Sequence, residues 1–220
     1  RARRGRLRVR RRRDDAPCVP ARPGRRAVGL SGAIPLCQAA GMVCVALLRG
    51  INVGGKNRVE MAKLKASFER LNFEDVKTYI NSGNVIFRHD ELPQAETIER
   101  ALEADFGFAI RVTVRSHQNI ESVTGALPDD WVNDADMKCD VMFLWDHVDG
   151  PELMDELTVK PDIDEVKRVE GALIWRVDRP VVTRSGMMRL AGSELYKSMT
   201  VRNCNTVRKL AAMMAAMESA

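Results

Sequence analysis

The 220-residue chain has few of the residues that build disulfide, metal or base-stacking sites. Its five cysteines are odd in number and show no CxxC spacing, which argues against a disulfide or zinc framework. Its three histidines have no metal-like spacing, and aromatic residues, at 5%, are too scattered to form a nucleic-acid stacking surface. No apolar run approaches the ~20 residues of a membrane span. We therefore expect no metal, no cofactor, and neither a membrane nor a nucleic acid as partner.

Positive charge is concentrated at the beginning of the chain. Residues 1–41 contain twelve arginines and two aspartates, a net charge of +10, which leaves −5 for residues 42–220. The arginine run at residues 10–13 and the lack of apolar periodicity predict a disordered leader. Because Met42 directly precedes a strong strand, we interpret the leader as translated sequence upstream of a start at Met42, with an arginine-rich transit peptide and a basic nucleic-acid arm as alternatives. The body is expected to be cytoplasmic.

Apolar periodicity in the body predicts an α+β fold of two halves. The first half, residues 42–125, indicates strand, helix, strand, strand, helix and strand at 43–48, 61–71, 76–80, 85–87, 95–106 and 110–114. This β-α-β-β-α-β order is typical of a ferredoxin-like unit. The second half, residues 126–220, partly repeats the order and ends in a helix, so we expect a β-α-β-β-α(-β) layout with antiparallel or mixed sheets. No convincing residue-level repeat relates the halves, and a duplication rests on topology alone.

The first predicted strand runs directly into a glycine-rich loop, Arg49–Asn57. Three glycines allow tight turns and present backbone N–H groups beside two cations, Arg49 and Lys56, a composition typical of a small anion-binding pocket. The segment from Gly50 to Lys56 partly matches the phosphate loop of nucleotide triphosphatases. However, Asn57 stands where a Ser or Thr should bind magnesium, and the predicted sheet is antiparallel. We therefore do not interpret the loop as a triphosphatase motif.

Three separated motifs resemble a bacterial family catalogued as domain of unknown function 1697. They are the loop with its preceding leucines, the segment Thr78–Val85, and the segment Thr200–Leu210. The resemblance covers about Met42 to the C-terminus. It implies a fold and candidate residues but no activity. The chain departs from the family pattern at Cys204, where an aromatic residue is common, and at Glu60, where Pro often precedes the first helix.

The candidate site combines residues from these motifs. We predict that a small anionic ligand, phosphate-bearing or nucleotide-like, is bound by Arg49, Asn52, Gly54, Gly55, Lys56, Asn81, Ser82, Asn84, Arg202 and Asn203. Each polar residue also has a structural alternative. The asparagines and Ser82 suit turns and helix caps, and Arg202 suits a carboxylate or a helix C-terminus. Whether the loop and the turn at residues 81–84 lie together depends on strand order.

The function class remains open between three readings. We favour binding of a small anion by the loop. The first alternative is an enzyme of unknown reaction in which Arg49 or Lys56 stabilises developing negative charge, although we identify no nucleophile and no catalytic residue. The second is a protein–protein interaction module that uses a sheet face or the methionine-rich tail helix. The sequence does not indicate an oligomeric state.

Overall fold

The first half of the body forms a ferredoxin-like unit. The computed structural model describes residues 41–220, so the predicted disorder of residues 1–40 lies outside the described residues. The elements are β1 (Met42–Leu48), α1 (Met61–Arg70), β2 (Glu74–Tyr79), β3 (Asn84–His89), α2 (Ala95–Phe106), β4 (Val112–Ser116) and α3 (His117–Gly125). The four strands form an antiparallel sheet in the order β2-β3-β1-β4. This arrangement confirms the predicted fold class for the first half.

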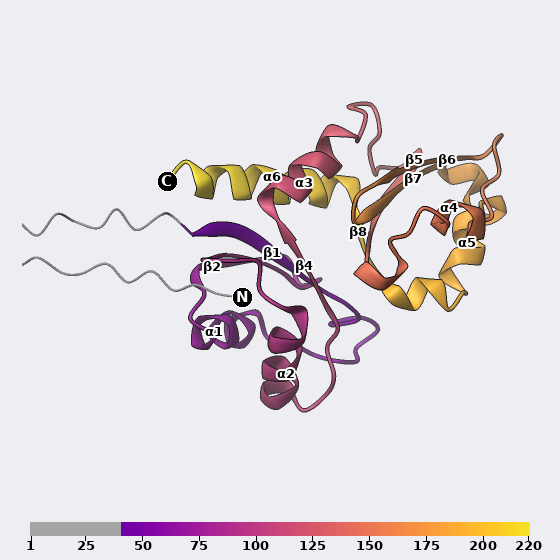
Figure 1. The fold of residues 1–220 in the computed structure, drawn as a ribbon. Helices are drawn as coiled ribbons and strands as arrows, with labels where there is room; N and C mark the ends of the chain where they lie inside the picture. Colours follow the sequence, from indigo (N-terminus) through magenta and orange to yellow (C-terminus); the bar gives the residue numbers. More distant parts are fainter. Residues whose placement is uncertain (1–40) are drawn as a thin grey trace, which may run out of the picture. The chain divides into compact units, whose positions relative to one another are not determined.

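The second half repeats this topology (Figure 1). Its elements are β5 (Met137–Leu144), η1 (Asp146–Val148), α4 (Leu153–Glu156), β6 (Asp164–Val169), β7 (Ala172–Asp178), η2 (Arg179–Arg184), α5 (Gly186–Ala191), η3 (Leu195–Ser198), β8 (Met199–Asn203) and α6 (Cys204–Glu218). The antiparallel strand order, β6-β7-β5-β8, matches the first sheet strand for strand. The sequence analysis did not identify β8 as a strand, because its short segment alternates polar with apolar residues only briefly.

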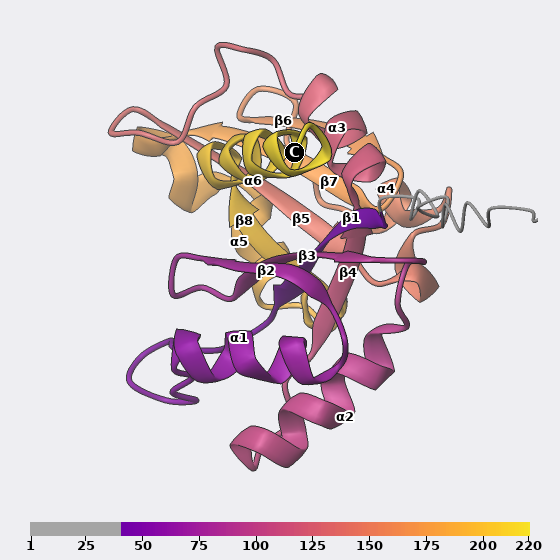
Figure 2. The same ribbon diagram turned by 90° about the vertical axis from the view of Figure 1, so that its left-hand side faces the viewer.

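The continuous apolar run of β1 is explained by burial on both faces of its sheet. Cys44, Ala46 and Leu48 pack with α1 and α2, which lie on one side of the first sheet in Figure 1. Val43 and Val45 point to the other side and join a core that also contains β5, α3 and α6. Figure 2 shows α3 and α6 lying side by side. The two halves therefore share one hydrophobic core and each has a further core of its own.

The matching topology exposes a short residue-level repeat that the sequence analysis did not detect. Both β4 and β8 carry a Thr-Val-Arg sequence, Thr113–Arg115 in the first half and Thr200–Arg202 in the second. Each is followed by the residue that caps the next helix. Ser116 accepts a hydrogen bond from the first turn of α3, and Asn203 does the same for α6. The repeat places one arginine at the equivalent position of each half.

Candidate functional site

The glycine-rich loop and the β2–β3 turn lie together at one edge of the first sheet. Because β3 lies next to β1, the turn that begins β3 meets the end of β1. The Leu48 amide donates to the Gly83 carbonyl at 2.8 Å, and the Asn52 side chain donates to the Asn81 carbonyl at 2.9 Å. The structure thus places the loop and the turn side by side, a point that the sequence alone left undecided.

Asn52 holds the loop in shape rather than presenting its side chain to solvent. Its amide nitrogen also donates to the Val59 carbonyl at 3.0 Å, and its side-chain oxygen accepts from the Val59 amide at 2.8 Å. Its backbone φ is 55°, in the left-handed region that Asn tolerates better than most residues. These contacts correspond to the structural alternative for Asn52, a cap that fixes the base of the loop.

Arg202 is buried against the same edge and donates hydrogen bonds to backbone groups. Only 7% of the residue is exposed. Its Nη2 donates to the carbonyls of Leu48, Ser82 and Gly83 at 2.8, 3.0 and 3.0 Å, and its Nε donates to the Asn84 side chain. Desolvation by burial lowers the pKa of Arg202 to about 10. The guanidinium therefore joins β8 of the second half to the loop and turn of the first.

The remaining asparagines of the predicted set also have structural partners. Asn203 caps α6 by accepting from the Thr206 amide at 2.8 Å. Asn84 is fully buried, and its amide nitrogen donates to the Tyr79 carbonyl at 2.9 Å and to the Ser82 hydroxyl at 3.2 Å. Asn81 and Ser82 are exposed at the turn. These residues give the edge a fixed backbone on which the loop is mounted.

The tip of the loop is different, because it is exposed and positively charged. Gly54 and Gly55 have φ angles of 58° and 77°, and a β-carbon added at either would meet nothing within 4 Å. Lys56 and Arg58 are exposed, and no carboxylate within residues 41–220 forms an ion pair with either. The sequence analysis did not include Arg58, which stands just beyond the glycines.

Arg49 lies between the loop tip and the second half. Its Nη1 donates to the Met199 carbonyl, and its guanidinium carbon lies 5.0 Å from the centre of the Tyr196 ring. These contacts hold the side chain against η3 and β8 but leave the residue partly exposed. Contacts within the fold therefore hold the Arg49 side chain, and the residue is close in sequence to the exposed Lys56 and Arg58.

Arg115, which belongs to the first half and corresponds to Arg202, lies at the equivalent edge of the second half. Its Nη2 donates to the carbonyls of Leu144 and Gly171, as Arg202 does to Leu48 and Gly83. Its Nη1 lies 3.6 Å from a carboxylate oxygen of Asp146. Desolvation by burial lowers the pKa of Arg115, while the carboxylate of Asp146 opposes this shift. Each half therefore supplies an arginine to the sheet edge of the other half.

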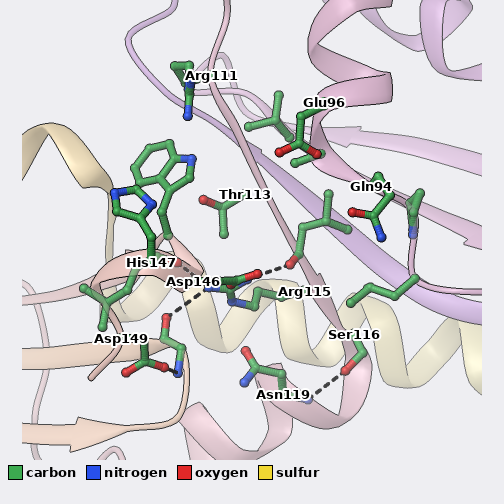
Figure 3. Close-up of a pocket in the computed structure, with 18 of the residues that line it drawn as sticks. Gln94, Glu96, Arg111, Thr113, Arg115, Ser116, Asn119, Asp146, His147 and Asp149 are labelled. Atoms are coloured by element: carbon green, nitrogen blue, oxygen red, sulfur yellow. Dashed lines mark hydrogen bonds and ion pairs between the residues drawn. The ribbon is translucent and has the colours of Figure 1, made fainter. Parts of the chain in front are cut away.

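Beside Arg115 lies a cleft of about 730 Å³ (Figure 3). Its walls come from β4, the beginning of α2 and of α3, the end of β5, η1 and the β6–β7 turn. In Figure 3, Asp146 lies beside Arg115, with Thr113 above this pair and Asn119 below it. The sequence analysis did not propose this cleft. The only signal for it in the sequence was the Thr-Val-Arg repeat.

Neither a metal site nor a membrane span is found among the described residues. Residues 41–220 contain no group of three or more His, Cys, Asp or Glu side chains placed to hold a metal ion. In the same range, every helix is too short or too polar to cross a membrane.

Comparisons with known proteins agree with the resemblance seen in the motifs. The family model described as "Protein of unknown function (DUF1697)" matches residues 42–175. A solved structure of the conserved bacterial protein SP0830 from Streptococcus pneumoniae is similar, with a TM-score of 0.64 and 26% sequence identity. That match covers 79% of this chain and 98% of the pneumococcal chain. The comparison with curated proteins gave no match.

Proposed function

The chain belongs to the family of proteins of unknown function DUF1697, and on that premise we propose that it is a cytoplasmic protein that binds a small, phosphate-bearing anion at its glycine-rich loop. The binding groups are the backbone amides of Gly54 and Gly55 and the side chains of Lys56 and Arg58. Asn52 and Arg202 hold the loop against the β2–β3 turn, and Asn203 caps α6.

The observation that carries this proposal is an exposed pair of cations beside exposed glycine amides. Neither Gly54 nor Gly55 donates its amide to another group of the described residues. Successive amides in a turn with left-handed φ values form a concavity that favours anions. Lys56 and Arg58 add two positive charges within four positions of those amides. A phosphate can use both kinds of donor, whereas a cation or an apolar ligand can use neither.

The buried residues favour binding by holding the loop in one conformation. Arg202 and Asn52 fix the two ends of the contact between loop and turn through backbone carbonyls. A loop that is already ordered loses less conformational entropy when it binds a ligand. The roles of the predicted residues therefore divide into ligand contact at the tip and support at the base.

The proposal is tested by calorimetric titration with inorganic phosphate, pyrophosphate and ATP. We expect at least one of them to bind, and we expect Lys56→Ala and Arg58→Ala each to weaken that binding by about 1.5–3 kcal/mol, the range for hydrogen bonds to charged groups. Lys65→Ala is the matched control, because Lys65 is an exposed helix lysine paired with Glu69 at 3.6 Å. If none of the three anions binds, or if the loop variants bind as Lys65→Ala does, the proposed function is wrong.

A further inference from the structure

The cleft beside Arg115 contains an unusual concentration of buried polar atoms without partners. Among residues 41–220, six side-chain nitrogen or oxygen atoms are buried without a hydrogen-bond partner, and four of them belong to residues that line this cleft. The four are Thr113 Oγ1, Arg115 Nε, Asn119 Oδ1 and Trp145 Nε1. A buried polar group without a partner destabilises the fold. Four such atoms around one cleft indicate that their partner comes from outside the chain.

The equivalent position in the other half shows what a satisfied arrangement looks like. There the hydroxyl of Thr200 accepts from Arg202 at 3.1 Å, and Arg202 Nε donates to the side chain of Asn84. Strand register makes Ala172 the counterpart of Asn84, since they follow Gly171 and Gly83 and pair with equivalent residues of β5 and β1. Alanine has no side-chain acceptor, and Arg115 Nε is left without one. In the second half, the Thr hydroxyl and the Arg Nε of the repeat therefore have hydrogen-bond partners within the chain. In the first half, the same two atoms have none.

The inner wall of the cleft presents donors that lack a hydrogen-bond acceptor. Arg115 Nε and Trp145 Nε1 can only donate, and the hydroxyl of Thr113, a residue only 3% exposed, can also donate. A carboxylate offers about four lone-pair sites to such donors. Arg115 adds the positive charge that a carboxylate favours.

The rim of the cleft is acidic and favours a positively charged ligand group. Glu96, Asp146 and Glu170 line it, and 97% of the Asp146 side chain is exposed. Asp149 also lines it but is already bonded to Arg168 and to the Gly171 amide. With Arg111 and Arg115 as the lining cations, carboxylates outnumber cations four to two. This excess disfavours a multiply charged anion such as a nucleoside triphosphate.

Asp146 contributes to both ligand preferences, the acceptor near Arg115 and the positive charge at the acidic rim. It lies 3.6 Å from Arg115, a distance that marks a loose pair, and its exposed side chain is free to turn. A ligand carboxylate can take its place beside Arg115, and Asp146 can then turn to meet a ligand ammonium group.

From this arrangement we propose that the cleft is a second binding site, separate from the loop, for a small zwitterion that carries both a carboxylate and an ammonium group, such as a free amino acid or a short peptide. The carboxylate lies at Arg115, Thr113 and Trp145. The ammonium group lies at Asp146 and the acidic rim. Asn119 Oδ1 accepts from a ligand N–H.

The test uses the dipeptide alanylalanine in calorimetric titration of the full chain. Binding is expected for the free dipeptide, with at least tenfold weaker binding after its two ends are blocked by acetylation and amidation. Thr113→Val and Trp145→Phe should each weaken binding at least threefold, because each removes a buried donor that has no partner in the fold. Thr200→Val is the matched control within the repeat, and it should not change dipeptide affinity.

Three outcomes would overturn this proposal: no binding of alanylalanine at millimolar concentration, equal binding of the blocked dipeptide, or unchanged affinity in both Thr113→Val and Trp145→Phe. The two proposed sites are tested independently. Lys56→Ala should leave dipeptide binding unchanged, and Thr113→Val should leave phosphate binding unchanged. If the unmodified chain binds the dipeptide but none of the three anions, the loop site is refuted and the cleft is not affected.

Discussion

Replacing Arg202 with alanine should strongly destabilise the fold, because this arginine joins the two halves. Only 7% of the residue is exposed, and its guanidinium joins β8 to the end of β1 and to the β2–β3 turn. The variant removes every one of these contacts at once. It should therefore loosen the contact between the two halves at the edge that carries the glycine-rich loop.

The size of the effect follows from the acceptors that are left behind. Without Arg202, the Ser82 carbonyl and the Asn84 side-chain oxygen lose their donor, and the Leu48 carbonyl keeps only a 3.4 Å bond from the Thr200 hydroxyl. Each unsatisfied buried group costs about 1–3 kcal/mol. Release of the desolvated charge offsets part of the loss. We expect the free energy of unfolding to fall by about 3–5 kcal/mol.

Urea denaturation followed by circular dichroism measures this loss. Arg202→Lys should lie between wild type and Arg202→Ala, because an ammonium group supplies donors without the planar fork that reaches several carbonyls at once. Lys65→Ala, an exposed substitution, should stay within about 0.5 kcal/mol of wild type. A value for Arg202→Ala within about 1 kcal/mol of wild type would show that this arginine does not hold the two halves together.

Two further variants test the fold through pH and backbone geometry. Burial raises the pKa of Asp164, but hydrogen bonds from Ser185, Gly186, Lys160 and Trp175 outweigh it and hold the pKa below its ordinary value. The stabilisation by the Asp164 carboxylate is thus present above about pH 4 and is lost as the pH falls through the folded-state pKa. Urea midpoints should therefore fall less between about pH 6 and pH 3 in Asp164→Asn than in wild type. Parallel curves for the two proteins would contradict this. Gly83→Ala should cost about 3 kcal/mol or more in thermal unfolding, because φ is 78° and a β-carbon would meet Ile51 Cδ1 at 2.7 Å. Gly54→Ala meets nothing within 4 Å and should cost only about 1 kcal/mol, so equal losses would refute the argument.

The fold of the first half could be predicted from the sequence because its apolar periodicity is strong. The buried run of β1 and the helical spacing of α1 and α2 indicate their elements without tertiary information. β8 could not be predicted in this way. It contains Thr200 and Arg202, whose burial becomes favourable only through partners about 120 to 154 residues away in the chain. Composition in a local window carries no trace of those partners.

The candidate site was predictable only where it depends on local backbone. The sequence indicated left-handed glycines in the loop, and Gly50, Gly54 and Gly55 have positive φ values. The structural alternatives for Asn52 and Asn203 were also visible, since both follow local capping chemistry. The cleft was not predictable, because it arises where one strand of the first half meets the second half.

The Thr-Val-Arg repeat also could not be recognised from the sequence alone. Three identical residues in each half are too few to establish a duplication from sequence, and only the matching strand orders align them. Once aligned, they explain why one arginine is enclosed by hydrogen bonds and the other borders a cleft. The difference depends on the replacement of Asn84 by Ala172 at the equivalent position, which no local pattern reveals.

The most direct test of anion binding at the loop is a titration of the nitrogen-15-labelled protein with pyrophosphate, followed by amide chemical shifts. The proposal predicts that the largest shifts occur at the amides of Gly54 and Gly55, and that Lys56→Ala needs about tenfold more pyrophosphate or a higher excess to produce them. Thr113 and its neighbours in the cleft should not respond. Saturating pyrophosphate that leaves the loop amides unshifted, or that shifts only residues of another surface, would contradict the proposal.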